Sequence, residues 1–125
     1  MQHSAGFCKL TQEAKQQVRE TDIATIYARL NKGEQFYLID VRESDEWQRG
    51  HLPNATHLSK GIIERDIEKL VPDFNAEIVL YCGGGSRSAL AALNLQQMGY
   101  NNVISMDGGF RAWAAANYPI NYEEK

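Results

Sequence analysis

Short apolar runs recur along the chain, and the segments between them have the length and pattern of helices. We expect strands near residues 18–19, 36–39, 56–58, 77–81 and 103–106, and helices over 11–17, 22–30, 44–47, 59–70, 89–98 and 111–114. The runs at 36–39 and 78–81 are continuously apolar, as in strands that are covered on both faces. The alternation predicts an α/β fold with a parallel sheet and helices on both of its faces.

Several polar residues and glycines are placed to begin or end these helices. Asp22, Ser44 and Ser59 each stand where an N-cap is needed, because a short polar side chain there can accept a hydrogen bond from the first turn. Gly33 and Gly99 are suited to end the helices that precede them. These positions set the expected boundaries of the helices.

The length of 125 residues is enough for one domain with a proper core. We expect a helical extension over residues 1–17, the α/β domain over residues 18–120 and a short tail over residues 121–125. No linker, repeat or low-complexity segment interrupts the predicted domain.

Composition excludes some partners. The net charge is −3 and the basic residues are scattered, which argues against a nucleic-acid partner. The longest apolar stretches fall far short of the roughly 20 residues that span a bilayer, so no membrane partner is expected. Residues 1–7 lack the charged start and apolar middle of a signal peptide, which favours a cytoplasmic location.

Only two cysteines are present, Cys8 and Cys82, and they do not form a C-x-x-C pair. A disulfide between them would be unexpected in a reducing cytosol. Cys8 is interpreted as a small apolar side chain, and a resolving thiol for Cys82 is the alternative. The three histidines have no ligand-like spacing, so no metal is expected.

A cysteine stands where the strand at 78–81 is followed by a helix. The segment reads Cys82, Gly83, Gly84, Gly85, Ser86, Arg87 and Ser88. Three glycines permit positive φ angles and inward-pointing N–H groups, and the helix start adds unpaired donors and the positive end of its dipole. This environment lowers a thiol pKa, so we expect Cys82 to be a nucleophilic thiolate and residues 83–88 to bind an anion.

Charged residues lie at the same expected edge of the sheet. Arg87 in the first turn of a helix opposes the dipole and therefore needs an anion or a carboxylate nearby. Asp40 and Arg42 follow an apolar strand, where unpaired charges are costly, and we expect them to pair with each other or to brace the cysteine loop. Asp107 is interpreted as a turn former before Gly108.

These pieces together resemble the rhodanese-like domain family. The matching segments are Leu38-Ile39-Asp40-Val41-Arg42-Glu43, Glu46, Gly50-His51-Leu52-Pro53-Asn54-Ala55, the loop from Cys82 to Ser88, Gly108-Gly109-Phe110 and Ala112-Trp113. The resemblance implies a three-layer α/β/α domain with a central five-stranded parallel sheet. It also implies sulfurtransferase activity through a persulfide on Cys82, without a cofactor. The implied partners are a small sulfur donor, a thiol or cyanide acceptor and a sulfur-relay protein.

One departure from the family pattern bears on the donor. Several thiosulfate-using members carry basic residues just after the cysteine, whereas Gly83, Gly84 and Gly85 are uncharged. A low-molecular-weight persulfide or the persulfide of a partner protein suits this neutral loop equally well.

Two other functions stay open at this point. Cysteine-dependent phosphatases and arsenate reductases place five residues between cysteine and arginine, whereas four separate Cys82 from Arg87. The shorter ring fits one sulfur anion better than a tetrahedral oxyanion. Rhodanese-like domains also serve as non-catalytic interaction modules, but inactive members commonly lack the cysteine that this chain retains.

Overall fold

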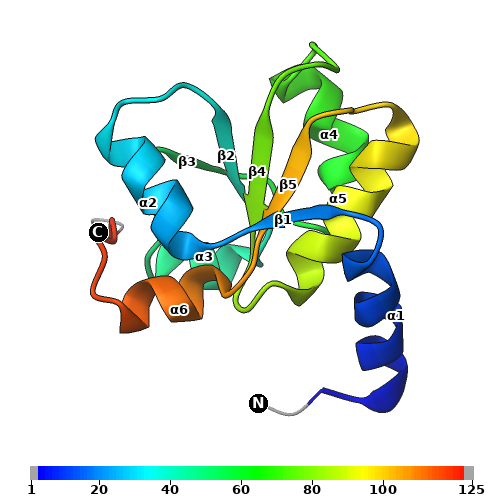
Figure 1. Ribbon diagram of the computed structural model, residues 1–125, viewed down its shortest axis with the longest axis horizontal. Coiled ribbons are helices and arrows are strands. Elements are labelled where there is room, and N and C mark those ends of the chain that lie inside the picture. The colour runs from blue at the N-terminus through cyan, green and yellow to red at the C-terminus, as the bar shows by residue number, and fades with distance from the viewer. Residues whose placement is uncertain (1–2, 123–125) are drawn as a thin grey trace.

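The computed structural model, which describes residues 3–122, has a parallel five-stranded sheet at its centre (Figure 1). The strands are β1 (Arg19–Thr21), β2 (Tyr37–Asp40), β3 (Ala55–His57), β4 (Ile78–Tyr81) and β5 (Val103–Met106). The helices are α1 (Ala5–Lys15), α2 (Ile23–Asn31), α3 (Ser44–Gln48), α4 (Ile63–Leu70), α5 (Ser86–Met98) and α6 (Gly109–Ala115). The predicted fold class is confirmed.

The order of strands across the sheet is β1-β5-β4-β2-β3, and every pair is parallel. After β2 the chain adds β3 at one edge of the sheet, and after β4 it adds β5 on the opposite side. The direction therefore reverses between the neighbouring strands β2 and β4. In such sheets ligands bind beyond the carboxyl ends of the strands at the point where the direction reverses. The segment that starts at Cys82 lies at this point, because it directly follows β4.

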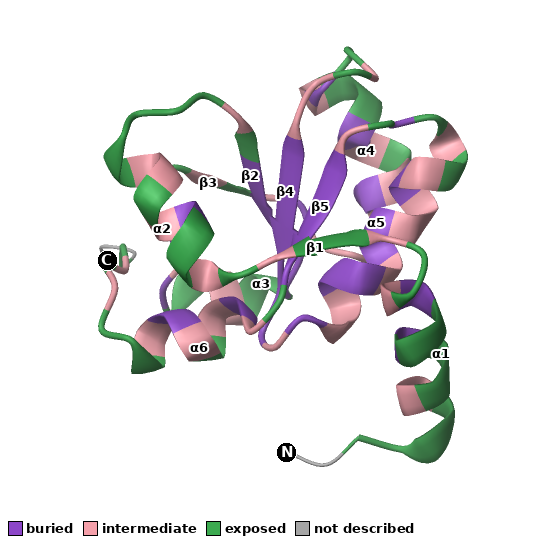
Figure 2. Cartoon of the chain, viewed as in Figure 1, coloured by how far each residue is buried: buried purple, intermediate pink, exposed green. Residues whose placement is uncertain are grey.

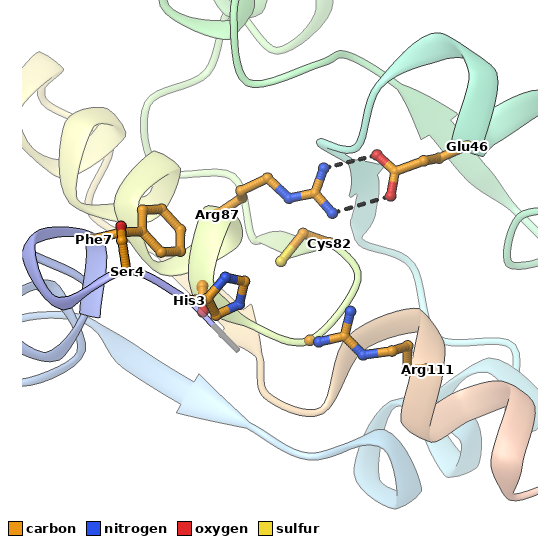
Figure 3. Close-up of a pocket in the computed structure, with 9 residues that line it drawn as sticks. His3, Ser4, Phe7, Glu46, Cys82, Arg87 and Arg111 are labelled. Atoms are coloured by element: carbon orange, nitrogen blue, oxygen red, sulfur yellow. Dashed lines mark hydrogen bonds and ion pairs between the residues drawn. The ribbon is translucent and has the colours of Figure 1, made fainter. Parts of the chain in front are cut away.

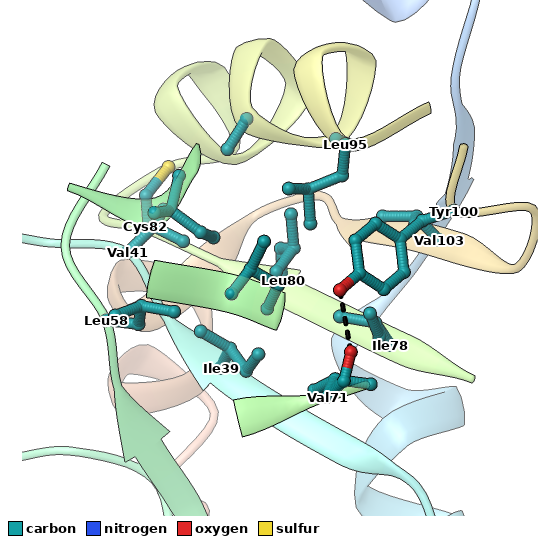
Figure 4. Close-up of a cluster of buried hydrophobic side chains, with 14 residues drawn as sticks. Ile39, Val41, Leu58, Val71, Ile78, Leu80, Cys82, Leu95, Tyr100 and Val103 are labelled. Carbon is teal, nitrogen blue, oxygen red and sulfur yellow. Dashed lines mark hydrogen bonds between the residues drawn. The ribbon is translucent and has the colours of Figure 1, made fainter. Parts of the chain in front are cut away.

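The two faces of the sheet bury separate apolar cores. Ile78 and Leu80 of β4 pack with residues of α4 and α5 (Figure 4), whereas Val79 and Tyr81 pack with residues of α2 and α6. All four residues of β4 are buried (Figure 2), as the continuously apolar run predicted. This burial on both faces fixes the end of β4, from which the cysteine loop departs.

Two of the predicted helix boundaries are confirmed in detail. Asp22 caps α2, and its carboxylate accepts a hydrogen bond of 2.8 Å from the backbone N–H of Thr25. Gly99 ends α5 with a φ of 114°, a left-handed conformation that glycine adopts without strain.

Two other predicted caps are wrong. Glu43, not Ser44, is the N-cap of α3, because a capping box with Glu46 satisfies the free N–H groups of the first turn. Ser59 does not start α4, since its carbonyl closes a turn with the N–H of Ile62 at 3.0 Å. The helix begins only after Ile62.

The N-terminal helix begins earlier than predicted, at Ala5 rather than at residue 11. It packs against α5, and Thr11 and Ala14 are buried. Its last residue, Lys15, pairs with Asp107 at 2.8 Å and with Glu20 at 3.0 Å. These contacts attach the predicted extension to the carboxyl edge of the sheet.

The predicted tail, residues 121–125, is described only as far as residue 122, and residues 123–125 lie outside the described part. Asn121 exchanges two backbone hydrogen bonds with His51, at 2.8 and 2.9 Å. Within residues 3–122, none of the helices has the length and apolar character needed to cross a membrane.

Candidate functional site

An open cavity of about 620 Å³ lies over the start of α5, at the carboxyl end of β4 (Figure 3). Residues from four separate parts of the chain line it: His3, Ser4, Phe7, Glu46, Cys82, Gly84, Ser86, Arg87 and Arg111. Cys82 lies at the base of this cavity and is only 1% exposed. A substrate therefore has to enter the cavity to reach the sulfur.

The Cys82 Sγ atom accepts hydrogen bonds from the loop and from the first turn of α5. The backbone N–H of Gly85 lies 3.1 Å from Sγ and that of Ser88 lies 3.4 Å away. The Ser88 hydroxyl is 3.6 Å from Sγ and 2.8 Å from the hydroxyl of Ser105 in β5. Ser88 can thus donate to a thiolate while it accepts from Ser105.

These hydrogen bonds determine the direction in which the cysteine titrates. Burial by itself raises the pKa of the Cys82 thiol, but the hydroxyl of Ser88 and the backbone N–H groups of Ser88, Gly85 and Gly84 lower it. The hydrogen bonds outweigh burial, so that the pKa lies below its ordinary value. The direction agrees with the expectation from the sequence.

The start of α6 fixes the orientation of the cysteine loop. The N–H of Phe110 donates to the carbonyl of Cys82 at 2.8 Å, and the N–H of Arg111 donates to the carbonyl of Gly83 at 2.9 Å. Because these carbonyls face α6, the following N–H groups are free to face Sγ. Gly109 makes this approach possible, since a β-carbon there would collide with the carbonyl of Cys82.

The three loop glycines do not all act as predicted. Only Gly85 has a positive φ, 111°. Gly83 and Gly84 instead leave room for side chains, because a β-carbon on Gly83 would lie 3.0 Å from Arg87 Nη2 and 3.1 Å from Arg111 Nη1. The expectation of positive φ angles is therefore wrong for two of the three. A single left-handed residue is enough to turn the chain into α5.

The carboxylate that Arg87 needs is supplied by Glu46 of α3. The two side chains form a double hydrogen bond, with distances of 2.7 and 3.1 Å (Figure 3). Hydrogen bonding to Arg87 is the main reason that the pKa of Glu46 falls to about 2. Glu46 is therefore ionised at neutral pH, and the pair neutralises most of the charge of Arg87.

Arg111 is a second arginine at the cavity, and it has a different environment. It extends from α6 across Gly83 and Gly84, and a β-carbon on Gly84 would collide with its guanidinium. Among the described residues, no carboxylate forms an ion pair with it. Arg111 therefore contributes an uncompensated positive charge to the wall of the cavity.

Asp40 and Arg42 pair with each other and do not line the cavity. Arg42 donates to both carboxylate oxygens of Asp40, at 2.7–3.1 Å, and to the carbonyl of Gly50 at 2.7 Å. The guanidinium carbon of Arg42 lies 4.2 Å from the ring centroid of Phe110, which hydrogen-bonds the cysteine loop. Arg42 thus contacts the ring of Phe110, and the backbone of Phe110 in turn contacts the cysteine loop.

Several residues of the site were not identified from the sequence as functional. Glu46 was noted only as part of the family pattern, and Arg111 falls between two matching segments of that pattern. Ser105 had a signal, because a hydroxyl in an apolar strand must find a partner. The role of His3, Ser4 and Phe7 had no local signal, since their position depends on how α1 packs. Within residues 3–122, no group of three or more His, Cys, Asp or Glu side chains could hold a metal ion.

The family follows from comparison with known proteins. A family model described as rhodanese-like domain matches residues 22–116. The chain belongs to the rhodanese-like domain family. Rhodanese-like relatives include a putative sulfurtransferase, YtwF, of Bacillus subtilis (33% identity, covering 84% of this chain and 99% of the relative). A sulfurtransferase of Allochromatium vinosum is 34% identical (82% and 94%), and a putative sulfur carrier protein, YrkF, of Bacillus subtilis is 29% identical (77% and 51%).

Solved structures of similar proteins carry more than one functional description. A protein of unknown function from Rhodopseudomonas palustris, described as a possible tyrosine phosphatase, has a TM-score of 0.85 at 28% identity and covers 97% of this chain and 98% of its own. A polysulfide-sulfur transferase homodimer from Wolinella succinogenes has a TM-score of 0.78 at 27% identity, covering 96% and 90%. The rhodanese-like fold of this chain is therefore shared over nearly its whole length, α1 included.

Proposed function

We propose that the protein is a sulfurtransferase that carries sulfane sulfur as a persulfide on Cys82. The observation that carries the proposal is the position of Cys82 Sγ, 3.1 Å from the amide nitrogen of Gly85 and 3.4 Å from that of Ser88. Donors fixed in this way stabilise a sulfur anion without having to rearrange. Membership of the rhodanese-like family and the sulfurtransferase names of relatives support the same chemistry.

The proposed reaction has two steps. The Cys82 thiolate attacks the outer sulfur of the donor, a new S–S bond forms, and the bond to the rest of the donor breaks with its electron pair leaving on the departing group. An acceptor then attacks the outer sulfur of the persulfide and releases the Cys82 thiolate. The acceptor is a thiol, cyanide or a protein cysteine. These steps need neither a metal nor an organic cofactor.

A sulfur-relay protein is among the proposed partners. The putative sulfur carrier YrkF supports this choice by its name, although this chain spans only 51% of it. A reducing cytoplasm is the proposed location, because it keeps a free Cys82 available between turnovers.

The contacts of the site argue against a phosphatase. A phosphatase needs a general acid for the leaving group, and Glu46 is the only carboxylate in the described lining of the cavity. With a pKa of about 2, Glu46 holds no proton at neutral pH. Arg87 directs two of its five N–H groups at Glu46, so Glu46 already occupies part of its capacity to bind the oxygens of a phosphoryl group.

Mass spectrometry after incubation with a sulfane donor tests the proposal. The peptide that contains Cys82 should gain the mass of a sulfur atom, and Cys82→Ser should abolish both this adduct and sulfur transfer to cyanide. Cys8→Ser is the matched control and should retain both. Transfer that survives in Cys82→Ser would contradict the proposal.

Two further outcomes would replace the sulfurtransferase proposal with another function. Efficient hydrolysis of an aryl phosphate that depends on Cys82 would favour a phosphatase. A folded protein that forms no adduct with any sulfane donor would favour the non-catalytic interaction module.

A further inference from the structure

The cavity has features that the proposed transfer of sulfur does not use. Its volume of about 620 Å³ is far larger than a small inorganic anion such as thiosulfate requires. Its walls differ in character. In Figure 3, His3 and Phe7 lie on one side of Cys82, and Arg111 lies on the other.

The polar wall offers a cation without a partner. Arg87 and Arg111 flank Gly83, since a β-carbon there would lie 3.0 Å from one guanidinium and 3.1 Å from the other. Arg87 is neutralised by Glu46, whereas within residues 3–122 no carboxylate pairs with Arg111. Arg111 is therefore placed to bind an anionic group of a ligand whose reacting atom is at Cys82.

The apolar wall comes from α1. Phe7 is half-buried, and its ring contacts the ring of His3 in an edge-on arrangement with 4.9 Å between centroids. Lys15 holds the other end of α1 through its ion pair with Asp107. Because α1 also packs against α5, Phe7 forms a stable surface beside the entrance to Cys82.

We propose that the sulfur donor is a low-molecular-weight organic persulfide with a carboxylate, which Arg111 binds while Phe7 contacts the organic part. The inference rests on the sulfurtransferase function proposed above, because it names the donor of the same site. In the transfer, Cys82 thiolate attacks the terminal sulfur of R–S–SH. The old S–S bond breaks, R–S⁻ departs and takes a proton from water, and Cys82 holds the terminal sulfur with its proton. No net oxidation or reduction occurs.

Two matched donors test the role of Arg111: the persulfide of N-acetylcysteine, which has a carboxylate, and the persulfide of N-acetylcysteine amide, which does not. The measurement is the second-order rate constant for the gain of sulfur on Cys82, followed by rapid quench and mass spectrometry. The wild-type protein should favour the carboxylate donor by about fivefold, the upper range for an ion pair of an exposed side chain.

Arg111→Gln should remove this preference, and Arg111→Lys should restore part of it. Gly84→Ala should weaken the preference without removing the charge, because the new methyl group occupies the space of the guanidinium. Arg65→Gln is the control. Its side chain is 73% exposed on α4 and pairs with Asp66, so the preference should not change.

Phe7→Ala tests the apolar wall. It should slow sulfur transfer from both organic donors severalfold and to the same degree, and it should slow transfer from thiosulfate less, because thiosulfate has no organic part to contact Phe7. Equal rates with both organic donors in the wild-type protein and in Arg111→Gln would overturn the inference. A wild-type protein that takes sulfur faster from thiosulfate than from either organic donor would overturn it as well, as would organic-donor rates that Phe7→Ala leaves undiminished. Failure of every donor to modify Cys82 would instead overturn the sulfurtransferase proposal itself.

Discussion

At the scale of single residues, the chemistry depends on how the surroundings of Cys82 offset its burial. A cysteine that is 1% exposed would ordinarily stay protonated. The Ser88 hydroxyl and backbone N–H groups reverse this, and Ser105 holds the hydroxyl in a position to donate. The same donors remain available to the outer sulfur of a persulfide.

Removal of the Ser88 hydroxyl should raise the pKa of Cys82. A hydrogen bond to a charged group typically contributes about 1.5–3 kcal/mol, so loss of the Ser88 hydroxyl should shift the pKa of Cys82 clearly upward. The rate of alkylation by a small reagent, measured against pH, gives this value. Ser86→Ala is the control, because Ser86 lines the cavity and, among the described residues, the hydrogen bonds to Sγ come from Gly85 and Ser88 instead. An unchanged profile in Ser88→Ala would contradict this account of the thiolate.

The buried pair of Asp40 and Arg42 should matter chiefly for stability. Asp40 is 0% and Arg42 4% exposed, so removal of either partner leaves a buried charge, which typically costs about 3–5 kcal/mol. We expect Asp40→Ala and Arg42→Ala each to lower the melting temperature clearly and to reduce sulfur transfer as well. Thermal unfolding and a transfer assay on the same samples separate the two effects.

An exposed pair provides the comparison. Asp45 and Arg49 are 3.5 Å apart and each side chain is 71% exposed, so Asp45→Ala should change stability by less than about 0.5 kcal/mol. Normal stability with complete loss of transfer in Arg42→Ala would assign Arg42 a direct part in the reaction.

At the scale of elements, the cysteine loop is held by α6 as well as by β4, from which it departs. The two hydrogen bonds from Phe110 and Arg111 fix the loop carbonyls, and the same turn projects the Arg111 side chain over the loop glycines. The orientation of these carbonyls and the position of the Arg111 guanidinium therefore both depend on the close contact between Gly109 and the backbone of Cys82 and Gly83.

A side chain at Gly109 should disrupt this approach. Its φ is 55°, and a β-carbon would collide with backbone atoms of Cys82 and Gly83, which have no room to move as a flexible side chain would. We expect Gly109→Ala to destabilise the protein by at least about 2 kcal/mol and to raise the pKa of Cys82.

Chemical denaturation and alkylation measure these two effects. Gly61→Ala is the control, since nothing lies within 4 Å of a β-carbon there, and it should change stability by no more than about 0.5 kcal/mol. A Gly109→Ala protein of normal stability would contradict the close approach.

At the scale of the whole molecule, ion pairs connect segments that are distant in the sequence. Glu46 joins α3 to α5, Lys15 joins α1 to the end of β5, and Arg29 joins α2 to the start of β4 through Glu77. Hydrogen bonding to arginine lowers the pKa of Glu46 and of Glu77. Stability should therefore depend on pH in the acid range.

The pKa of Glu46 is about 2 in the folded protein, against 4.5 for an unperturbed glutamate. Its contribution to the free energy of unfolding is thus complete above about pH 4.5 and is lost as the pH falls toward 2. For a side chain that is 26% exposed, we expect a contribution on the order of 2 kcal/mol. Urea denaturation between pH 2 and 7 measures it.

Glu46→Gln should lower the free energy of unfolding at neutral pH. It should also reduce the loss of this free energy between about pH 4.5 and 2. Glu68→Gln, at an exposed position of α4, should leave the profile as it is. If Glu46→Gln loses as much unfolding free energy at acid pH as the wild-type protein, the pair of Glu46 and Arg87 contributes little to folding.

Local sequence patterns were enough to predict the alternation of strands and helices and the position of Cys82 between a strand and a helix. Both are local features: the apolar run of β4 and the glycines that follow it are contiguous in the chain. The need of Arg87 for a carboxylate was also readable, because the helix dipole acts within one turn.

Packing between distant segments settles which carboxylate meets Arg87 and which cation of the cavity has no carboxylate partner within residues 3–122. Glu46 and Arg111 come to Cys82 from other elements, and their approach follows from the strand order and from contacts distant in sequence. The start of α4 was misplaced for a similar reason, since a turn at Ser59 takes precedence over its helix-capping preference. Likewise, α1 lines the cavity only because it packs against α5. Patterns along a chain specify local conformation, whereas the composition of a site depends on which segments bury their apolar faces together.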